Sequence, residues 1–434
     1  MPSILIKNGR VLSPEDKLDG EMDVLVEDGL IREIAPRIGR AGQGSRANEV
    51  IDAAGQIVSP GFIDLHSHLR EPGGEISETL KTGLRAAVAG GFTSVCAMPN
   101  TRPVNDRPES TRAIIERAQQ IGLARVFPIA AVSMGSEGEL LTDFEALAAA
   151  GAVAFSDDGR PVKTAVLMRQ ALERGLSLGV PIIDHCETPE LSAGGAMNEG
   201  EVSHRLNVKG IPNASEDNCV ERDIQVAEET GGHVHIAHLS TARACEMVRA
   251  AKRRGVRVTC EVTPHHLTLT DEAVEKHGTH AKMNPPLRSA ADLARVLSAF
   301  SEGTVDVLAT DHAPHAPELK SKPLAEAPFG IIGFETALPL ALAQLVFPGR
   351  ISLAHLIVLM SSNPARIIRQ RVNPSLGRLR VGGAADITIF DPKREWVYRA
   401  AEGRSKSRNS PFNGWKFNGK PTATLVCGRI VYRA

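Results

Sequence analysis

The chain is short of cysteine pairs, of net charge and of long apolar runs, and each shortage excludes a class of protein. Its six cysteines include no C-x-x-C pair, which indicates neither a disulfide framework nor a zinc knuckle but reduced thiols in a cytoplasmic protein. A formal net charge of −1 lacks the basic excess that a nucleic-acid or membrane surface would need. The longest apolar stretch, from about Thr336 to Phe347, is too short to cross a bilayer.

The start of the chain also lacks a basic segment followed by an apolar core, so we expect no signal peptide. What is present is ordinary: 434 residues, 42% of them apolar and 23% charged. A chain of this size and balance can bury a large core, and we expect one large domain with a smaller one beside it.

The two ends of the chain share a pattern that differs from the middle. Short alternating runs punctuated by Gly and Asp, at 3–9 and 23–34 and again at 385–391 and 423–432, predict short β-strands. Neither end can bury a good core alone. We therefore expect residues 1–56 and 376–434 to build one small β-sandwich, beside a central domain of residues 57–375.

The central region alternates between strand and helix patterns. The eight candidate strands are Ile57–Leu65, Phe92–Pro99, Val126–Ser133, Gly151–Asp158, Val180–Cys186, His233–Leu239, Val256–Thr263 and Val305–Thr310. The helical patterns between them include Ser77–Ala89, Ser110–Gln120, Ala165–Arg174, Asn218–Glu229, Ala242–Lys252 and Ala290–Phe300. Alternation implies a parallel sheet and eight units imply closure, so the predicted fold is α/β, a (β/α)8 TIM-like barrel with its active site at the C-terminal strand ends.

The first candidate strand ends in two imidazoles, His66 and His68. Strand side chains alternate between faces, so residues two apart point the same way and can grip one divalent metal ion. Polar residues of the same kind follow the other strands: Met98-Pro99-Asn100-Thr101, Phe155-Ser156-Asp157-Asp158-Gly159, Asp184-His185-Cys186-Glu187, His235-Ile236-Ala237-His238, Thr263-Pro264-His265-His266 and Thr310-Asp311-His312-Ala313-Pro314-His315.

A histidine at one strand end is more often structural than a ligand, but several converging on one barrel mouth reverse that expectation. Four histidines and two carboxylates suffice for two zinc-like ions, with one carboxylate bridging them. The chemistry that this set suits is metal-assisted hydrolysis or its reverse, in which an Asp on the last strand moves the proton.

The run Gly61-Phe62-Ile63-Asp64-Leu65-His66-Ser67-His68 resembles the signature of the amidohydrolase superfamily. Further motifs resemble bacterial dihydroorotases of the first type: His68-Leu69-Arg70-Glu71-Pro72-Gly73, Met98-Pro99-Asn100-Thr101, Phe155-Ser156-Asp157-Asp158-Gly159, Lys282-Met283-Asn284-Pro285-Pro286-Leu287-Arg288, Ala309-Thr310-Asp311-His312-Ala313-Pro314-His315 and Ala327-Pro328-Phe329-Gly330. The resemblance runs essentially end to end. It implies reversible cyclisation of N-carbamoyl-L-aspartate to dihydroorotate and water, a step of pyrimidine synthesis.

The same resemblance implies two zinc ions per chain. His66 and His68 would hold one ion, and His185 and His238 the other. Relatives that bridge the ions with a carboxylated lysine have it after strand four, where this chain has Asp158. Its neighbour Asp157 is the rival for the bridge, since alternation lets only one of the two point inward, and the family pattern favours Asp158.

Asp311 would ligate the first ion and act as general acid and base. Arg70, Asn100 and His315 would grip the free carboxylate of the substrate, for which an arginine offers a planar fork. Asn284 and the backbone at Phe329-Gly330 would meet the pyrimidine ring. The substrate contacts that the resemblance implies are His68, Arg70, Asn100, Asn284, His315, Phe329 and Gly330.

The other histidines are read as structural or solvated. His233 and His235 lie inside their strand, and a role in orienting ligands is left open for His265-His266. His204, His277, His280 and His355 are expected at the surface. Cys186 lies beside a predicted ligand but has no dedicated base, so it is not read as a nucleophile. The aperiodic stretch 316–328 is expected to be a mobile loop over the site.

Two other functions compete with this one. A hydantoinase or allantoinase would share the barrel and metals but would be expected to carry the bridging lysine and to lack Arg70 and Asn100. A metal-poor structural partner of aspartate carbamoyltransferase would be expected to have lost ligands, and this chain retains all six positions. A homodimer is expected, and a complex with aspartate carbamoyltransferase stays open.

Overall fold

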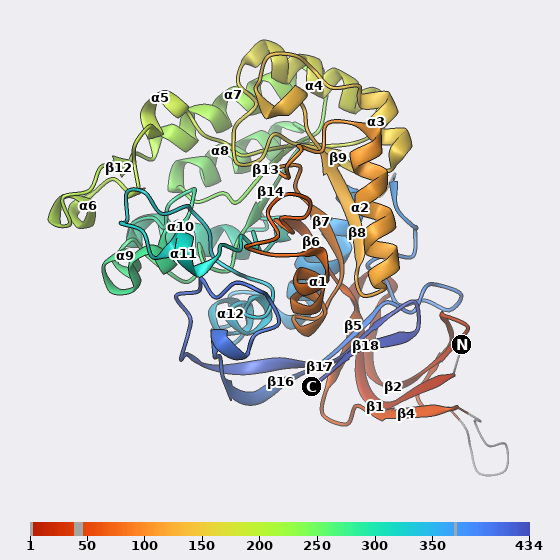
Figure 1. Cartoon of the computed structure of the whole chain (residues 1–434). Helices are drawn as coiled ribbons and strands as arrows, with labels where there is room; N and C mark the ends of the chain where they lie inside the picture. Colours follow the sequence, from red (N-terminus) through yellow and green to blue (C-terminus); the bar gives the residue numbers. More distant parts are fainter. Residues whose placement is uncertain (1–2, 39–46, 369–370) are drawn as a thin grey trace.

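The computed structural model describes residues 3–38, 47–368 and 371–434, and it consists of a barrel and a second sheet built from both ends of the chain (Figure 1). The barrel strands lie in the order β15-β14-β13-β10-β9-β8-β7-β6, and every pairing between them is parallel. Their bounds are β6 (Phe62–Ser67), β7 (Phe92–Ala97), β8 (Arg125–Ala130), β9 (Ala154–Phe155), β10 (Ile182–Asp184), β13 (Val234–Ile236), β14 (Val258–Val262) and β15 (Val307–Leu308).

The ring closes between the first strand and the segment that follows the last. Ser67 forms a parallel bridge with His312, and the backbone N–H of His68 donates to the carbonyl of His312 at 2.9 Å. The predicted (β/α)8 barrel is therefore confirmed, with one of its eight seams made by this short contact rather than by a full ladder.

Helices cover the outside of the barrel and begin where the sequence supplies caps. The side chains of Thr79, Asp143, Thr164, Thr241 and Ser289 each accept a hydrogen bond from a backbone N–H of the first helical turn, which satisfies an otherwise unpaired donor. The main helices are α1 (Leu80–Ala89), α2 (Pro108–Ile121), α3 (Phe144–Ala150), α4 (Ala165–Leu178), α7 (Ala214–Thr230), α8 (Ala242–Arg254) and α10 (Ala290–Ser301).

Shorter elements fill the connections at the barrel mouth and after β15. They are α5 (Pro189–Ser192), β11 (Met197–Asn198), α6 (Glu201–Arg205), β12 (Gly210–Ile211), α9 (Glu272–His277), α11 (Pro317–Lys320), α12 (Ala337–Ala341), α13 (Leu353–Ile357) and α14 (Asn363–Ile367). Within the described ranges, no helix combines the length and the apolarity that crossing a membrane requires.

The second sheet, called here the terminal sheet, joins strands from both ends of the chain, as the matching patterns predict. Its order is β18-β17-β16-β5-β1-β2-β3, with β4 also paired to β1. The strands are β1 (Ile4–Ser13), β2 (Leu18–Glu27), β3 (Leu30–Ala35), β4 (Glu49–Asp52), β5 (Ile57–Pro60), β16 (Ile387–Val397), β17 (Lys416–Val426) and β18 (Arg429–Arg433). Its core mixes side chains from the two ends, including Val11, Val24, Ile387, Ile389 and Leu425.

The expectation of a single strand over Ile57–Leu65 is wrong, because this run forms two strands in different sheets. β5 pairs with β1 and β16 in the terminal sheet, whereas β6 pairs with β7 in the barrel. Gly61 lies between them, and a Cβ at that position would be 2.1 Å from Oγ1 of Thr93. Only glycine permits this close approach, which brings the chain from one sheet into the other just before the site.

Candidate metal centre

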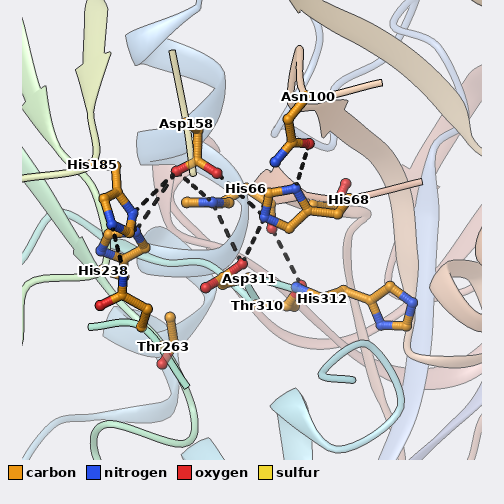
Figure 2. Close-up of polar contacts among 12 residues, drawn as sticks. His66, His68, Asn100, Asp158, His185, His238, Thr263, Thr310, Asp311 and His312 are labelled. Carbon is orange, nitrogen blue, oxygen red and sulfur yellow. Dashed lines mark hydrogen bonds and ion pairs between the residues drawn. The ribbon is translucent and has the colours of Figure 1, made fainter. Parts of the chain in front are cut away.

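The six predicted metal ligands meet at the C-terminal mouth of the barrel (Figure 2). They come from the ends of five strands: His66 and His68 from β6, and the others from the residues that follow β9, β10, β13 and β15. All six side chains are buried, with exposed fractions between 0% and 6%. The set comprises His66, His68, Asp158, His185, His238 and Asp311.

Asp158 lies between two groups of imidazoles. Its Oδ1 is 3.3 Å from Nε2 of His66, and its Oδ2 is 3.4 Å from Nε2 of His68. The same Oδ1 is 3.7 Å from Nδ1 of His185 and 3.7 Å from Nε2 of His238. One carboxylate is thus shared by two clusters whose ligand atoms lie within 4.8 Å of one another, which is the arrangement that a bridging carboxylate needs.

Asp311 completes the first cluster from the opposite side. Its Oδ1 lies 3.0 Å from Nε2 of His68 and 3.5 Å from Nε2 of His66. With His66 and His238 it forms a third group of atoms within 4.8 Å. Imidazole nitrogens and carboxylate oxygens in this proportion suit zinc and similar divalent ions.

Two buried atoms at the centre of this set support a cation there. Among the described residues, Nε2 of His66 and Oδ1 of Asp158 make no hydrogen bond, although they face each other at 3.3 Å. A buried polar atom without a hydrogen bond is costly unless an ion or water satisfies it. A second buried cluster, Asp184, Cys186, Cys219 and Asp223, differs in this respect. The guanidinium of Arg222 already pairs with both of its carboxylates, at 3.2 and 2.6 Å.

Two carboxylates give the centre the negative potential that a cation site requires. Burial lowers the pKa of an imidazole, but the carboxylates of Asp158 and Asp311 outweigh it and raise the pKa of His66 well above its usual value. Burial raises the pKa of a carboxyl, yet His66 and its neighbouring imidazoles hold the pKa of Asp158 and of Asp311 well below the usual range. Both carboxylates therefore stay ionised at neutral pH, as metal ligands must.

The backbone of the site is strained at three positions, two of them proposed metal ligands and the third a residue of the cavity wall. Arg70, His238 and Asp311 adopt φ values of 61°, 31° and 41°, a region that costs a non-glycine residue on the order of 1 kcal/mol or more. Such conformations gather at functional sites, where surrounding structure holds a side chain in an orientation that a relaxed strand end would not give.

Asp157 and Asp158, the two candidates for the bridging carboxylate, point in different directions. The carboxylate of Asp157 points away from the imidazoles and accepts hydrogen bonds from the backbone N–H and the hydroxyl of Ser133, at 3.0 and 2.6 Å. Asp158 points into the cluster. Only one of the two adjacent carboxylates faces the imidazoles, as strand alternation requires, and it is that of Asp158.

Sequence reasoning missed a carboxylate behind the first ligand. Oε1 of Glu261, on β14, lies 2.6 Å from Nδ1 of His66, and its Oε2 lies 3.2 Å from Nε2 of His235. Glu261 thereby holds the ring of His66 with Nε2 toward the cluster. The available signal was a charged residue inside the apolar run Val256–Thr263, since a fully buried carboxylate needs partners.

A cavity of about 270 Å³ opens beside the metal centre, and most of the predicted substrate contacts line it. Its wall includes His68, Arg70, Asn100, Asn284, His315 and Phe329. Gly330 does not line it directly but follows Phe329 in the chain. A volume of this size fits a small ring of the size of a pyrimidine, and charged and polar side chains of the lining can orient it.

Two amides connect this wall to the ligands. Oδ1 of Asn100 lies 2.9 Å from Nδ1 of His68, and Nδ2 of Asn284 lies 3.1 Å from Nε2 of His185. Glu187, which sequence reasoning also missed, lies 3.0 Å from the same nitrogen of His185. Burial lowers the pKa of His185, but Asp158 and Glu187 outweigh it and raise that pKa to about 10.

A cationic corner forms the far side of the cavity. Arg70 donates from Nε to the carbonyl of Pro314 at 3.2 Å, and its Nη2 lies 3.3 Å from Nε2 of His315. Burial lowers the pKa of Arg70 to about 10, which leaves the guanidinium charged at neutral pH. Nε2 of His315 lies 2.7 Å from the carbonyl of Phe329 and donates to it, so the imidazole also ties two loops together.

The remaining histidines lie outside the cluster. His265 and His266 are buried beside it, where His266 contacts Thr263 and the carbonyl of Pro285, at 2.7 and 2.9 Å, and no ligand. His233 and His235 share the hydroxyl of Thr259 inside the barrel. Those expected at the surface are exposed or partly exposed: His204, His277, His280 and His355.

The stretch 316–328 is not the plain loop that its sequence suggests. It begins with the short helix α11, and the buried ammonium of Lys320 donates to the carbonyls of Pro328 and Gly330 at 3.0 and 3.1 Å. The ammonium of Lys282 donates to Leu324 and Ala325 in the same stretch. Motion of this segment on substrate binding stays a prediction.

Comparison with known proteins agrees with this geometry. A family model described as "Dihydro-orotase-like" matches residues 55–244. The chain is 50% identical over 430 residues to a dihydroorotase of Syntrophus aciditrophicus (strain SB), covering 99% of each. It is 49% identical over 435 residues to a dihydroorotase of Geobacter sp. (strain M21), covering 100% of each.

Solved structures show the same architecture in other enzymes. An L-hydantoinase (dihydropyrimidinase) from Arthrobacter aurescens superimposes with a TM-score of 0.87 at 26% identity, covering 100% of this chain and 96% of that one. A D-hydantoinase (dihydropyrimidinase) from Thermus sp. superimposes with a TM-score of 0.82 at 26% identity, covering 99% and 95%.

Proposed function

This chain belongs to the dihydroorotase family, and from that premise we propose that it interconverts N-carbamoyl-L-aspartate and (S)-dihydroorotate with a two-zinc centre, as a step of pyrimidine nucleotide synthesis. The family and the hydantoinase-like fold support a hydrolase of cyclic amides. The observation that carries the finer proposal is the position of Asp158, shared between two clusters of imidazoles beside a cationic cavity.

The residues present fit two divalent ions. His66, His68 and Asp311 would hold the first ion and His185 and His238 the second, with Asp158 between them. When bound, such ions supply Lewis-acid polarisation of a carbonyl and lower the pKa of water toward neutrality.

Asp311 is the proposed proton carrier. Its Oδ1 lies 3.0 Å from Nε2 of His68 and 3.5 Å from Nε2 of His66, and the side chain also lines the cavity in which the substrate would lie. Ionised Asp311 can accept the proton of the attacking water and return it to the ring nitrogen that leaves when the amide opens. Closure of the ring runs the same path backwards and needs the carboxyl protonated, so ring opening should gain rate as pH rises and ring closure as pH falls.

The cationic corner is the proposed grip for the side carboxylate of the substrate. Arg70 offers a planar pair of donors, and Asn100 and His315 flank it on the cavity wall. Asn284 and the backbone at Phe329-Gly330 would meet the ring. A cyclic amide without that carboxylate gains nothing from this corner.

The same observations weigh against the competing functions. A hydantoinase or allantoinase has the same fold but no use for a cationic corner that binds a side carboxylate. A structural partner without metal has no need for six buried ligand-type side chains. Nor does it need buried atoms such as Nε2 of His66 and Oδ1 of Asp158, which make no hydrogen bond. We also propose a homodimer, which a mass measurement in solution tests, and leave a complex with aspartate carbamoyltransferase as a prediction.

Activity and metal content of the purified protein test this function together. We expect turnover of dihydroorotate and ring closure of carbamoyl aspartate, about two zinc ions per chain, and a kcat/KM for dihydroorotate at least about 100-fold above that for hydantoin or dihydrouracil, the range that loss of a buried ion pair gives. Elemental analysis, ultraviolet absorbance and both reaction directions are measured on one preparation. A metal-loaded protein that prefers hydantoin, or that closes no ring, contradicts the proposal.

A further inference from the structure

One segment of the terminal sheet reaches the barrel mouth. Between β16 and β17 the chain leaves the sheet and lies beside α12 (Figure 1). Residues 405–410 of this connection, called here the crossover segment, contact the loop after β6. The hydroxyl of Ser407 donates to the carbonyl of Ser77 at 2.6 Å, and the backbone N–H of Lys406 donates to Glu78 at 3.0 Å. The segment is therefore part of the scaffold of the site.

Asn409 of this segment bonds to the loops that form the substrate wall. Its Nδ2 donates to the carbonyls of Ala313 and Gly330, both at 2.9 Å, and its Oδ1 accepts from the backbone N–H of His315 at 3.1 Å. Its own carbonyl accepts from the N–H of Ile332 at 3.0 Å. The side chain is 1% exposed, and every hydrogen of its amide group is used.

These bonds join the two loops that carry the far side of the cavity. One loop, after β15, carries His315, and the other carries Phe329 and Gly330. Beyond Asn409, the loops are also tied by the bond between Nε2 of His315 and the carbonyl of Phe329 at 2.7 Å and by the backbone N–H of Ala313, which donates to the carbonyl of Ile331 at 2.9 Å. Without the amide of Asn409, the carbonyl of Ala313 and the N–H of His315 lose their side-chain partner, while the carbonyl of Gly330 keeps the ammonium of Lys320. The side chain of His315 and the backbone at Phe329-Gly330 can then shift relative to each other.

The metal ligands next to these loops are held by different contacts. The backbone N–H and hydroxyl of Thr310 donate to Asp64 at 2.8 and 2.6 Å. The carbonyl of His312 accepts from the N–H of His68 at 2.9 Å. Asp311 lies between these two anchors, so loosening the loops beyond Ala313 should leave the metal centre in place.

We propose that Asn409 is a positioning residue that sets the geometry of the substrate-carboxylate grip, an inference that rests on the proposed function. It acts through His315 and through the Phe329-Gly330 wall and does not itself line the cavity. Its contribution is to substrate selection, because a carboxylate held by a fork and an imidazole tolerates little displacement of either.

The matched test compares Asn409→Asp with Asn413→Asp in the metal-loaded enzyme. Aspartate keeps the shape at 409 and the acceptor for His315 but sets a carboxylate oxygen against two carbonyls. Asn413 lies four residues along the same connection, is exposed, and bonds only to the N–H of Ala400 at 3.0 Å. We expect KM for dihydroorotate to rise about 30-fold in Asn409→Asp with kcat within about threefold, and neither to change in Asn413→Asp.

A double-mutant cycle separates positioning from general damage. Arg70→Ala removes the grip itself, so Asn409→Ala should raise KM about tenfold in the wild-type background but less than about twofold beside Arg70→Ala. Zinc per chain should equal that of the wild type in every variant. Additive effects on KM would assign Asn409 a role unrelated to the grip.

The outcomes distinguish this inference from the proposed function. A wild-type enzyme that does not turn over dihydroorotate contradicts the proposed function before any variant is made. An active wild type whose Asn409→Asp and Asn409→Ala variants keep their KM overturns the inference alone. Variants of Asn409 that fold poorly or lose zinc also overturn it, because they show that the residue supports the whole structure and not the grip.

Discussion

At the scale of the residue, the site combines side chains that follow the barrel strands, such as His66 and His68, with side chains that support them from other segments. Two imidazoles spaced by one residue need no structure to be placed on one face. Glu261 and Asn409 could not be found that way. Asn409 lies 94 residues from His315 and 79 from Gly330 in sequence, and only the folded chain shows which loops it joins.

The choice between the two adjacent carboxylates gives a prediction at this scale. Asp158→Ala should abolish activity and lower zinc content below two ions per chain, because the shared ligand of both clusters is lost. Asp157→Asn is the matched control. It should keep most of the activity and all of the zinc, since the carboxylate of Asp157 accepts hydrogen bonds from Ser133 and points away from the imidazoles. Elemental analysis and turnover measurements on both variants test this assignment. If Asp157→Asn lost zinc and Asp158→Ala kept it, the bridge would be assigned to the wrong residue.

At the scale of the element, positions were predicted better than lengths. Every expected strand of the barrel has a counterpart, but β9 and β15 are only two residues long, because the polar residues that follow them turn into the site instead of continuing the ladder. The stretch 316–328 was misjudged for a related reason. A lysine in an aperiodic stretch suggests a solvated loop, whereas Lys320 is 3% exposed and bonds backbone carbonyls.

Burial of this lysine predicts a dependence of stability on pH. Burial, together with repulsion from Lys282, lowers the pKa of Lys320 to about 7. The unfolded chain, with a lysine pKa of about 10.4, then binds more protons between pH 7 and 10, so the free energy of unfolding rises with pH across that window. From pH 7 to 9 the wild type should gain about 2 kcal/mol relative to Lys320→Met.

Denaturant titrations at the two pH values measure this difference. The control is Lys322→Met, which changes an exposed lysine two residues away and should follow the wild type at both pH values. The prediction fails if the difference in the free energy of unfolding between wild type and Lys320→Met stays constant from pH 7 to 9. That result would show that the amine of Lys320 stays protonated over this range, stabilised by the carbonyls around it.

At the scale of the whole molecule, the pairing of the two chain ends followed from their shared pattern, but the contacts that fix the terminal sheet to the barrel did not. Arg125, at the start of β8, forms a bidentate ion pair with Asp386, through Nε at 3.0 Å and Nη2 at 2.9 Å. Asp386 also accepts from the backbone N–H of Cys427 at 2.8 Å, and its carbonyl accepts from Gly61 at 2.9 Å. One residue, Asp386, thus connects barrel, linker and sheet through its carboxylate and its backbone carbonyl, at the end of the barrel opposite the site.

The last prediction follows from that position. Asp386→Asn removes the charge but not the bulk, leaving the largely buried guanidinium of Arg125 without its counterion, which should lower the free energy of unfolding by about 2 kcal/mol. The exposed pair Arg10–Asp19 provides the control. Asp19→Asn should change the free energy of unfolding by less than about 0.5 kcal/mol, because solvent screens both groups. kcat and KM should be unchanged in both variants.

The same denaturation experiment reports whether barrel and terminal sheet unfold together. Both tryptophans of the chain, Trp396 and Trp415, lie on β16 and next to β17. They pack against a cluster that includes Phe417 of the sheet and Met283 and Leu340 from the barrel side, so fluorescence follows the contact between terminal sheet and barrel while far-ultraviolet circular dichroism follows the barrel helices. Because shared contacts such as Asp386 join the two parts, both signals should change in one transition, and Asp386→Asn should shift them equally. A fluorescence transition that moves alone, ahead of the dichroism, would show that the terminal sheet is a separate unit and that this carboxylate holds it only locally.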